Sequence, residues 1–436
     1  MSDKQEIMNL INEYTLSLGA GDLVEVKGQG TRVWDIEGNE YLDFEGGPGV
    51  LNFGHCHPRL VKVIQEQAAE MTQTSGTVAS VPCAMLAKKL AEITPGDLKR
   101  SFFCNSGAEA VDGAIKVVFK KASSQGRSEF GIMALRNAFH GRLSLPLSLT
   151  GLNGRKKGFG PYASFPGVVH VTPPYCYRCK LKHPECGCAC AESLQDNLNL
   201  SGPGGFVAFI SELVPCTGGI LVPPAGYWKR VQEICKENNI YFIDDEVFCG
   251  FGRTGKMFAA DLWDVKPDVM ATAKAVGGGL PMAATIATDE VACAMRPRDH
   301  FTTYGWNNLL GMKAGLEAIS VIEDENLVEN SRVQGEKLLA AFRDMMDRCD
   351  VIGDVRGVGL MLGIEIVEDK ASKLPNKALT NQITKALLQR RMIISTAGNA
   401  GNILRFTPPL IINDEDVELA LATVKAAFAD AGHPIR

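Results

Sequence analysis

The sequence has no long hydrophobic run and no long basic run. No apolar stretch among its 436 residues approaches the roughly 18 residues that a membrane-spanning helix needs. The N-terminal letters MSDKQEIMNLINEY lack the basic flank and apolar core of a secretory signal. The formal net charge of −5 gives no general attraction to nucleic acid or to anionic lipid. These absences predict a cytoplasmic protein that binds neither membranes nor nucleic acid.

A disulfide framework is not expected either. The thirteen cysteines are an odd number, and without an export signal reduced thiols are the better expectation. Five of them crowd into CYRCKLKHPECGCAC at 176–190. Its leading Cys-x-x-Cys suits half of a zinc or iron–sulfur site, with His183 among the further candidate ligands. The following Cys-x-Cys-x-Cys is crowded for a tetrahedral site, so we expect no bound metal and keep a metal centre as the alternative.

Short apolar runs alternate with helical stretches through the middle of the chain. The runs are SFFC at 101, GIMAL at 131, FVAFIS at 206, YFID at 241 and VMATA at 269. Strands that alternate with helices favour an α/β fold with a mostly parallel sheet between helices. GTRVWDIEGNEYLDF at 30–44 predicts two short N-terminal strands joined by a turn. We therefore expect an N-terminal segment with a short β element over 1–50, a large domain over 51–310 and a smaller α+β domain over 311–436.

One lysine, Lys274, follows the run VMATA and precedes three glycines in PDVMATAKAVGGGLP. A lysine at a strand end suits an amine that stands uncharged beside a planar group, because desolvation lowers its pKa enough to form a Schiff base. An arbitrary lysine is far more often a surface residue, so Lys274 alone decides nothing.

Two further features follow other predicted strands. NSGAEA at 105–110 offers successive backbone N–H groups at a helix start, which suits a phosphate, although an ordinary helix cap explains the same letters. Asp244, Asp245 and Glu246 crowd three acids at a strand end. At least one should meet a cation or a protonated nitrogen, and the alternative is that two face water. An amine, a phosphate site and a carboxylate for a ring nitrogen together describe a site for pyridoxal 5′-phosphate.

A series of motifs then occurs in order along nearly the whole chain: WDIEGNEYLDF, GHCHP, NSGAEA, AFHGR, DDEVFCGFGRTGKMF, PDVMATAKAVGGGLP, DVRGVGLMLGIE and LRFTPPL. In identity, order and spacing these motifs resemble the class III aminotransferases, which are pyridoxal-phosphate enzymes of fold type I. The resemblance implies a large cofactor-binding domain and a smaller C-terminal domain.

The resemblance also implies roles for single residues. Lys274 would be the Schiff-base lysine and would carry a proton to and from the substrate α-carbon, while Asp245 would pair with the pyridinium nitrogen. Phe139 and Val247 would press on the two faces of the ring. The other implied cofactor contacts are Ser106, Gly107, Ala108, His140, Glu212 and, from a neighbouring subunit, Thr303. A homodimer with shared active sites is therefore expected.

The expected substrate contacts are less uniform. Arg405 matches the arginine that binds the substrate α-carboxylate in this family. Arg142 would hold a second, distal carboxylate or serve the structure only. Trp306 stands where the family usually has glycine, and would narrow the pocket or pack in the subunit interface. Thr217 stands where relatives that act on ω-amino acids carry a glutamate that masks this arginine, so we expect Arg405 to be exposed to α-carboxylates throughout the cycle.

The implied activity is amino transfer between a small amino-bearing substrate and a 2-oxo acid, 2-oxoglutarate or pyruvate. Lyases acting on a phosphate- or phosphonate-bearing amine, decarboxylating transaminases and racemases share this fold and stay open as alternatives. A dehydrogenase is disfavoured: GFGRTG at 250–255 has the spacing of a dinucleotide fingerprint, but it lies several residues beyond the strand, and the acids before it would repel a pyrophosphate.

Overall fold

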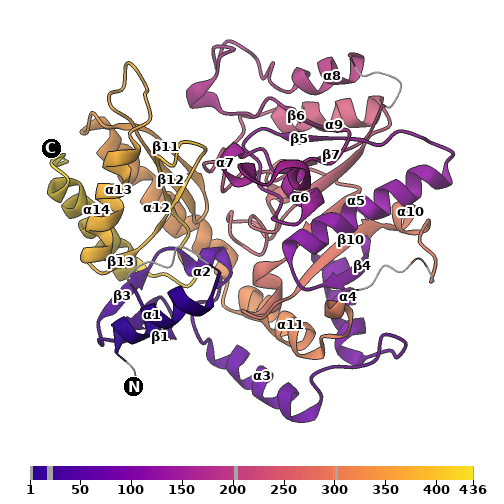
Figure 1. Ribbon diagram of the computed structural model, residues 1–436, viewed down its shortest axis with the longest axis horizontal. Helices are drawn as coiled ribbons and strands as arrows, with labels where there is room; N and C mark the ends of the chain where they lie inside the picture. The colour runs from indigo at the N-terminus through magenta and orange to yellow at the C-terminus, as the bar shows by residue number, and fades with distance from the viewer. Residues whose placement is uncertain (1–2, 17–22, 201–204, 298, 300–302, 436) are drawn as a thin grey trace.

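The computed structural model describes residues 3–16, 23–200, 205–297, 299 and 303–435. In Figure 1 the C-terminal helices and strands lie on one side, a large sheet flanked by helices lies on the other, and the N-terminal strands lie below the C-terminal elements. No helix in the described part of the chain is both long and apolar enough to cross a bilayer.

The large part of the molecule is organised by a seven-stranded sheet. In their order across the sheet the strands are β4 (Leu98–Cys104), β10 (Ala283–Thr288), β9 (Val269–Thr272), β8 (Tyr241–Asp245), β7 (Phe206–Ser211), β5 (Gly131–Leu135) and β6 (Val168–Val171). Only β10 is antiparallel to its neighbours, β4 and β9. The five strands expected from apolar runs are confirmed. β10 was missed because it is rich in alanine, which is depleted in strands, and β6 was missed although it is a short valine-rich run.

Helices cover both faces of this sheet. α5 (Gly107–Ser124) packs on one face, where its apolar side and the strands form one hydrophobic cluster. A capping box between Ser106 and Glu109 fixes the start of α5 directly after β4. The opposite face is covered by α4 (Val81–Ile93), α9 (Tyr227–Glu237) and α11 (Leu309–Asp324), together with α3 (Pro58–Glu70), which packs on α11. Both faces of the seven-stranded sheet are therefore buried, as is usual for a mostly parallel sheet.

The C-terminal part is a second, antiparallel sheet with helices. Its strands are β11 (Ile352–Val358), β12 (Met361–Ile366), β15 (Ile403–Phe406) and β14 (Ser395–Ala397). The helices packed with them are α12 (Leu327–Asp347), α13 (Lys377–Gln389) and α14 (Asp414–Asp430). These elements confirm the expected smaller α+β unit.

The N-terminal strands join this smaller unit. β2 (Arg32–Asp35) and β3 (Glu40–Asp43) confirm the two strands predicted for 30–44. β1 (Glu25–Gln29) pairs with β2 and completes a meander, and β13 (Met392–Ile393) pairs in parallel with β3. The remaining helices are α1 (Lys4–Tyr14), α2 (Gly46–Gly49), α6 (Ser144–Leu149), α7 (Asn153–Lys156), α8 (Glu192–Asn199) and α10 (Asp289–Ala292).

Packing also bears on the domain boundary that was expected at residue 311. This position falls inside α11, which packs against α3 and α4 of the large part, whereas the next helix, α12, packs against β11. We propose to place the boundary between α11 and α12, because a division there cuts no helix.

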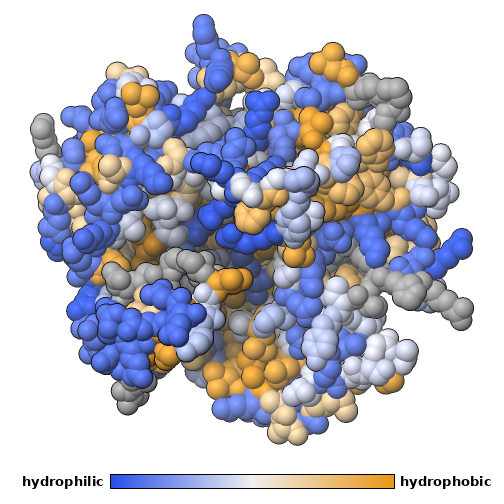
Figure 2. All heavy atoms as spheres, in the orientation of Figure 1, coloured by the Kyte–Doolittle hydropathy of each residue, from blue (hydrophilic) through white to orange (hydrophobic). Residues whose placement is uncertain are grey.

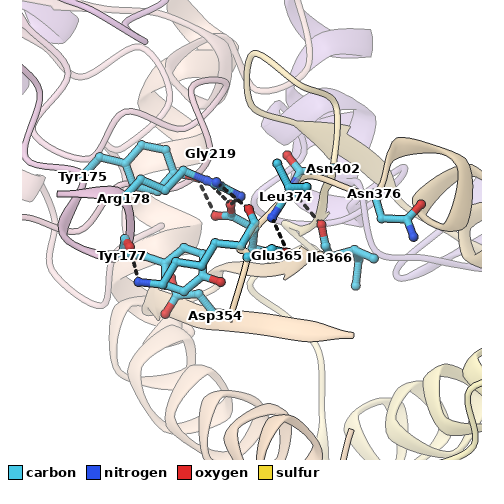
Figure 3. A network of polar contacts seen from close by, with 12 residues as sticks. Tyr175, Tyr177, Arg178, Gly219, Asp354, Glu365, Ile366, Leu374, Asn376 and Asn402 are labelled. Carbon is cyan, nitrogen blue, oxygen red and sulfur yellow. Dashed lines mark hydrogen bonds and ion pairs between the residues drawn. The ribbon is translucent and has the colours of Figure 1, made fainter. Parts of the chain in front are cut away.

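A polar network ties the cysteine-bearing segment to the smaller unit (Figure 3). Buried Glu365 on β12 accepts hydrogen bonds from Arg178 Nε at 2.6 Å and from Arg356 Nη1 at 2.8 Å. Arg356 Nε also donates to the carbonyl of Gly219 at 2.8 Å. Burial alone would raise the pKa of Glu365, but the neighbouring arginines and Tyr175 lower it overall. The carboxylate therefore stays ionised and joins three chain segments.

Close packing between α12 and the turn after β11 generates a stability prediction. A Cβ atom on Gly335 would lie 2.1 Å from the carbonyl oxygen of Gly359. We expect Gly335→Ala to cost about 1–3 kcal/mol of stability and to lower the melting temperature in a thermal scan. Gly154→Ala is the control, because nothing lies within 4 Å of its added carbon. Equal melting temperatures for the two variants would contradict this close packing.

Candidate active site

The carboxyl ends of five strands meet at one edge of the large sheet and deliver most of the predicted residues. β4 leads to Ser106, Gly107 and Ala108; β5 leads to Phe139, His140 and Arg142; β7 leads to Glu212; β8 ends at Asp245 and leads to Val247; and β9 leads to Lys274. All ten line one cavity of about 690 Å³. This edge is where an open α/β sheet places its ligand.

Lys274 lies at the inner wall of this cavity. It begins a single 3₁₀ turn, Lys274–Gly277, directly after β9 and has a φ of +54°, which a side-chain-bearing residue rarely adopts. Burial lowers the pKa of the amine, and the charge of Arg405 lowers it further, against the opposing effect of nearby acids. A lowered pKa favours the uncharged, nucleophilic form of the amine.

Asp245 and His140 form a buried pair beside this lysine. Asp245 Oδ2 lies 2.7 Å from His140 Nδ1, and Asp245 Oδ1 accepts the backbone N–H of Val247 at 3.1 Å. Both side chains are almost fully buried, and His140 Nε2 has no partner in the described structure. A carboxylate fixed in this way suits a protonated ring nitrogen in the cavity.

The start of α5 is a candidate anion site that also lines the cavity. The N–H groups of Gly107 and Ala108 are in the first turn of the helix, where no intrahelical acceptor exists. Gly107 also lets the backbone of α5 pack closely against Val247, because a Cβ at residue 107 would lie 2.7 Å from Val247 Cγ1. A phosphate at this position would receive two amide donors and the favourable end of the helix dipole.

Together these groups fit pyridoxal phosphate. The cavity has a phosphate-sized cradle at α5, a ring position with Phe139 and Val247 on its walls, a buried carboxylate and an amine. Glu212 braces this arrangement, because its carboxylate accepts the backbone N–H of Phe139 at 2.8 Å and that of Cys216 at 3.1 Å. Burial raises the pKa of Glu212 to about 7, with a further contribution from the charge of Asp245.

Arg405 lies behind the cavity on β15 and differs from expectation. Its side chain is only 9% exposed, and its guanidinium carbon lies 5.5 Å from the centre of the Phe248 ring. Phe248 lines the cavity and also lies 4.1 Å from Lys274 Nζ. The expectation that Arg405 is exposed to α-carboxylates throughout the cycle assumed that no carboxylate masks it, but the carboxylate of Glu45 lies 3.5 Å from its Nη2.

Two other predicted residues lie outside this cavity. Thr303 Oγ1 accepts a hydrogen bond from Asn105 Nδ2 of its own chain at 3.5 Å. Trp306 stacks on Phe102 with a centroid distance of 6.1 Å and lines a different cavity with it. Aromatic packing on β4 thus holds the indole away from the cavity of its own chain, and a role of Trp306 in substrate selection stays a prediction.

Several residues in or near the cavity were not predicted from the sequence. Arg155 on α7 lies near two predicted arginines: its pKa is lowered by burial and by the charges of Arg142 and Arg405. The last glycine of the run and the three residues after it, 279–282, also line the cavity. No periodic pattern marks these positions, although the basic letters RKK at 155–157 were visible in the sequence.

Comparison with known proteins agrees with this geometry. The family model of the class III aminotransferases matches residues 19–428. The chain belongs to this family. It is 37% identical over 430 residues to an acetylornithine aminotransferase of Methanothermobacter thermautotrophicus, covering 98% of this chain and 100% of the relative. A taurine–pyruvate aminotransferase of Bilophila wadsworthia is 34% identical, covering 98% of this chain and 97% of the relative.

A solved structure supports the same assignment and the cofactor. The ω-transaminase of Pseudomonas jessenii in complex with PMP superposes with a TM-score of 0.91, at 28% identity and with 97% of each chain covered. This class III aminotransferase is thus a fold type I, pyridoxal-phosphate-dependent enzyme that transfers an amino group between an amine and a 2-oxo acid.

The other acids at the end of β8 are also buried in this aminotransferase. Asp244 and Glu246 are at most 1% exposed, so the reading in which two of the three acids face water was wrong. Burial raises the pKa of Asp244 well above its usual range, with the charge of Glu246 adding to it, and burial raises that of Glu246 to about 8. Glu246 also accepts the backbone N–H of Ala260 at 2.9 Å, which fixes the loop after β8.

The cysteine cluster takes no part in this site. All thirteen cysteines lie in the described part of the chain and none forms a disulfide. Within the described ranges, no group of three or more His, Cys, Asp or Glu side chains is placed to hold a metal ion. Cys190 is buried in the main core, and Cys188 contacts the carbonyl of Ala225 at 3.5 Å.

The raised pKa of Glu246 predicts a pH-dependent stability. The unfolded pKa is 4.5 and the folded value is about 8, so the neutral side chain favours the folded state fully below the unfolded value. This contribution is lost as the pH rises through about 8, with a slope of at most about 1.4 kcal/mol per pH unit.

Glu246→Gln removes this titration. We expect its melting temperature to fall less than that of the wild-type enzyme between about pH 5 and pH 8. Glu40→Gln on β3, an exposed position, serves as the matched control and should follow the wild-type profile. Parallel profiles for all three proteins would refute a titrating Glu246.

Proposed function

We propose that Lys274 and Asp245 carry the amino-transfer chemistry of this enzyme. Pyridoxal phosphate, when bound, supplies an aldehyde that condenses with an amine and a protonated ring that accepts electrons from the substrate α-carbon. Lys274 would hold the cofactor covalently between turnovers and then move a proton at that carbon. The observation that carries this proposal is the enclosed Lys274 amine, whose pKa is lowered in a cavity that also contains the buried Asp245 carboxylate.

The remaining cavity residues would position the cofactor. Asp245, held by His140, would keep the ring nitrogen protonated. The first turn of α5, with Ser106, would hold the phosphate. Phe139 and Val247 would fix the plane of the ring, and Glu212 would act through Phe139 as a positioning residue.

The arginines suggest which substrates fit. Arg405 and Lys274 both lie close to the ring of Phe248. Arg405 would therefore hold an α-carboxylate close to the reactive amine. Arg142 lines the cavity, and its guanidinium carbon lies 5.7 Å from the Phe139 ring centre. Arg142 with the neighbouring Arg155 would hold a distal anionic group, as in 2-oxoglutarate. Pyruvate would use Arg405 alone.

We also propose a homodimer. Exposed apolar side chains gather in and between α3 and α4, including Val61, Met71, Val78, Val81 and Met85. Figure 2 shows apolar side chains over the lower part of the viewed face, around α3 and α11. A patch of this kind is typical of a protein–protein interface. Thr303, which lies outside its own chain's cavity, would then complete the phosphate site of the partner.

The role of Lys274 is tested with Lys274→Ala. The purified wild-type enzyme should show the visible absorbance of the bound cofactor, lose it when an amino donor is added and regain it with a 2-oxo acid. In the variant the covalent attachment and the proton transfer are both lost, so we expect activity to fall by about 10⁴-fold or more.

Lys266→Ala is the matched control, because Lys266 precedes the same strand, β9, and is 67% exposed. It should retain wild-type absorbance and turnover. Release of ammonia or phosphate by the wild-type enzyme without conversion of the cofactor would instead favour a lyase. Wild-type activity in Lys274→Ala would refute the assignment of this lysine.

Shared sites can be tested with mixed dimers. Co-purified dimers of one Lys274→Ala subunit and one Thr303→Ala subunit would contain one site with both defects and one intact site. At cofactor concentrations too low for Thr303→Ala homodimers, the mixed dimer should therefore recover up to about half of the wild-type activity.

If Thr303 instead serves its own chain, each site of the mixed dimer carries one defect. Activity would then stay at the level of the homodimeric variants. A monomer in analytical ultracentrifugation would contradict the dimer itself.

A further inference from the structure

Glu45 is held next to Arg405 by its backbone. It lies between β3 and α2, where its N–H donates to Asp43 Oδ1 at 2.8 Å. Its carbonyl accepts the Thr407 hydroxyl at 3.1 Å and the N–H of Gly49 at 3.0 Å. These bonds tie Glu45 to the residues just after β15, the strand that carries Arg405. The side chain of Glu45 is 27% exposed, so it is in contact with solvent.

The guanidinium of Arg405 is only partly satisfied. Its Nε donates to Ser395 Oγ at 2.8 Å, which fixes the orientation of the group. Its outer nitrogens have weaker partners: Nη1 lies 3.9 Å from the Cys216 sulfur, and Nη2 lies 3.5 Å from Glu45 Oε1. Charge-assisted bonds are usually about 2.7–2.9 Å long, so Glu45 is close enough to balance the charge and far enough to be replaced.

We propose that Glu45 is an exchangeable counter-ion that lets the enzyme accept two classes of amino substrate. It pairs with Arg405 when the bound amine has no α-carboxylate, and it withdraws when an α-amino acid or a 2-oxo acid brings its own carboxylate. This inference rests on the proposed role of Arg405 in carboxylate binding. It supplies, from a segment 360 residues away, the carboxylate that the Thr217 position lacks.

The physical basis is the cost of a buried, unpaired charge. An amine without an α-carboxylate, such as taurine, would leave Arg405 buried and unbalanced if Glu45 were absent. An α-carboxylate must instead displace Glu45, because two carboxylates beside one guanidinium repel each other. Glu45 therefore favours the first class of substrate and opposes the second.

Glu45→Gln is the test, because it keeps the size of the side chain and removes its charge. The two half-reactions are measured separately from the cofactor absorbance. For glutamate and alanine we expect KM to fall, and kcat/KM to rise, by about tenfold. For taurine and 4-aminobutyrate we expect kcat/KM to fall by about tenfold. Glu40→Gln is the control, since Glu40 pairs with Arg32 outside the cavity.

A binding measurement without turnover separates this role from a structural one. Glutarate, which carries carboxylates but no amino group, should raise the melting temperature of the Glu45→Gln holoenzyme more than that of the wild-type holoenzyme. A variant that was merely less stable would lose activity with both substrate classes and would not bind glutarate more tightly.

Two results would overturn the inference: equal changes for both substrate classes, or no change for either, in a wild-type enzyme that does transaminate. Failure of the proposed function is a different result, since the wild-type enzyme itself would then fail to convert its cofactor with any amine. Opposite shifts for the two classes, with an unchanged Glu40→Gln enzyme, would support the exchange of Glu45.

Discussion

The site depends on one constraint: several charged groups must leave water together. Asp245, Glu212 and Arg405 are buried, and the amine of Lys274 is enclosed beside them. Each group alone would pay a large desolvation penalty, but together they compensate one another. The parallel strands bring three of these groups to one edge, and the helices on both faces exclude water from it. The fold therefore shields these groups from water and keeps them close to one another.

The fourth group, Arg405, lies on β15 of the smaller unit, directly behind the candidate active site. On β15 it is paired in register with Gly363 of β12 and with Ser395 of β14, whose hydroxyl orients the guanidinium. A slip of one residue in this register would turn Arg405 to the opposite face of the sheet. The bond from Arg356 to Gly219 ties the same sheet to the loop after Glu212. If Arg405 binds the substrate carboxylate as proposed, contacts between the two units would set the position of that carboxylate.

The features that could be predicted are those that depend on short stretches of the sequence. Apolar runs marked the ends of β8 and β9, and with them Asp245 and Lys274, and the small residues after β4 marked the helix start. The features that were missed depend on distant packing. Glu246 is bound by the backbone of the loop at Ala260, and the place of Trp306 is set by stacking on Phe102. The contact between Glu45 and Arg405 has no local signal at all.

The polar contacts of the site fall into two kinds, and the difference follows from what an aminotransferase has to hold. Asp245 and His140 are 2.7 Å apart and buried, so their geometry is fixed. Glu45 and Arg405 are 3.5 Å apart, and Glu45 is partly exposed. A cofactor stays through the whole cycle and gains from a rigid partner. An amine and a 2-oxo acid share one cavity in turn, so the group that recognises them gains from a partner that can be displaced.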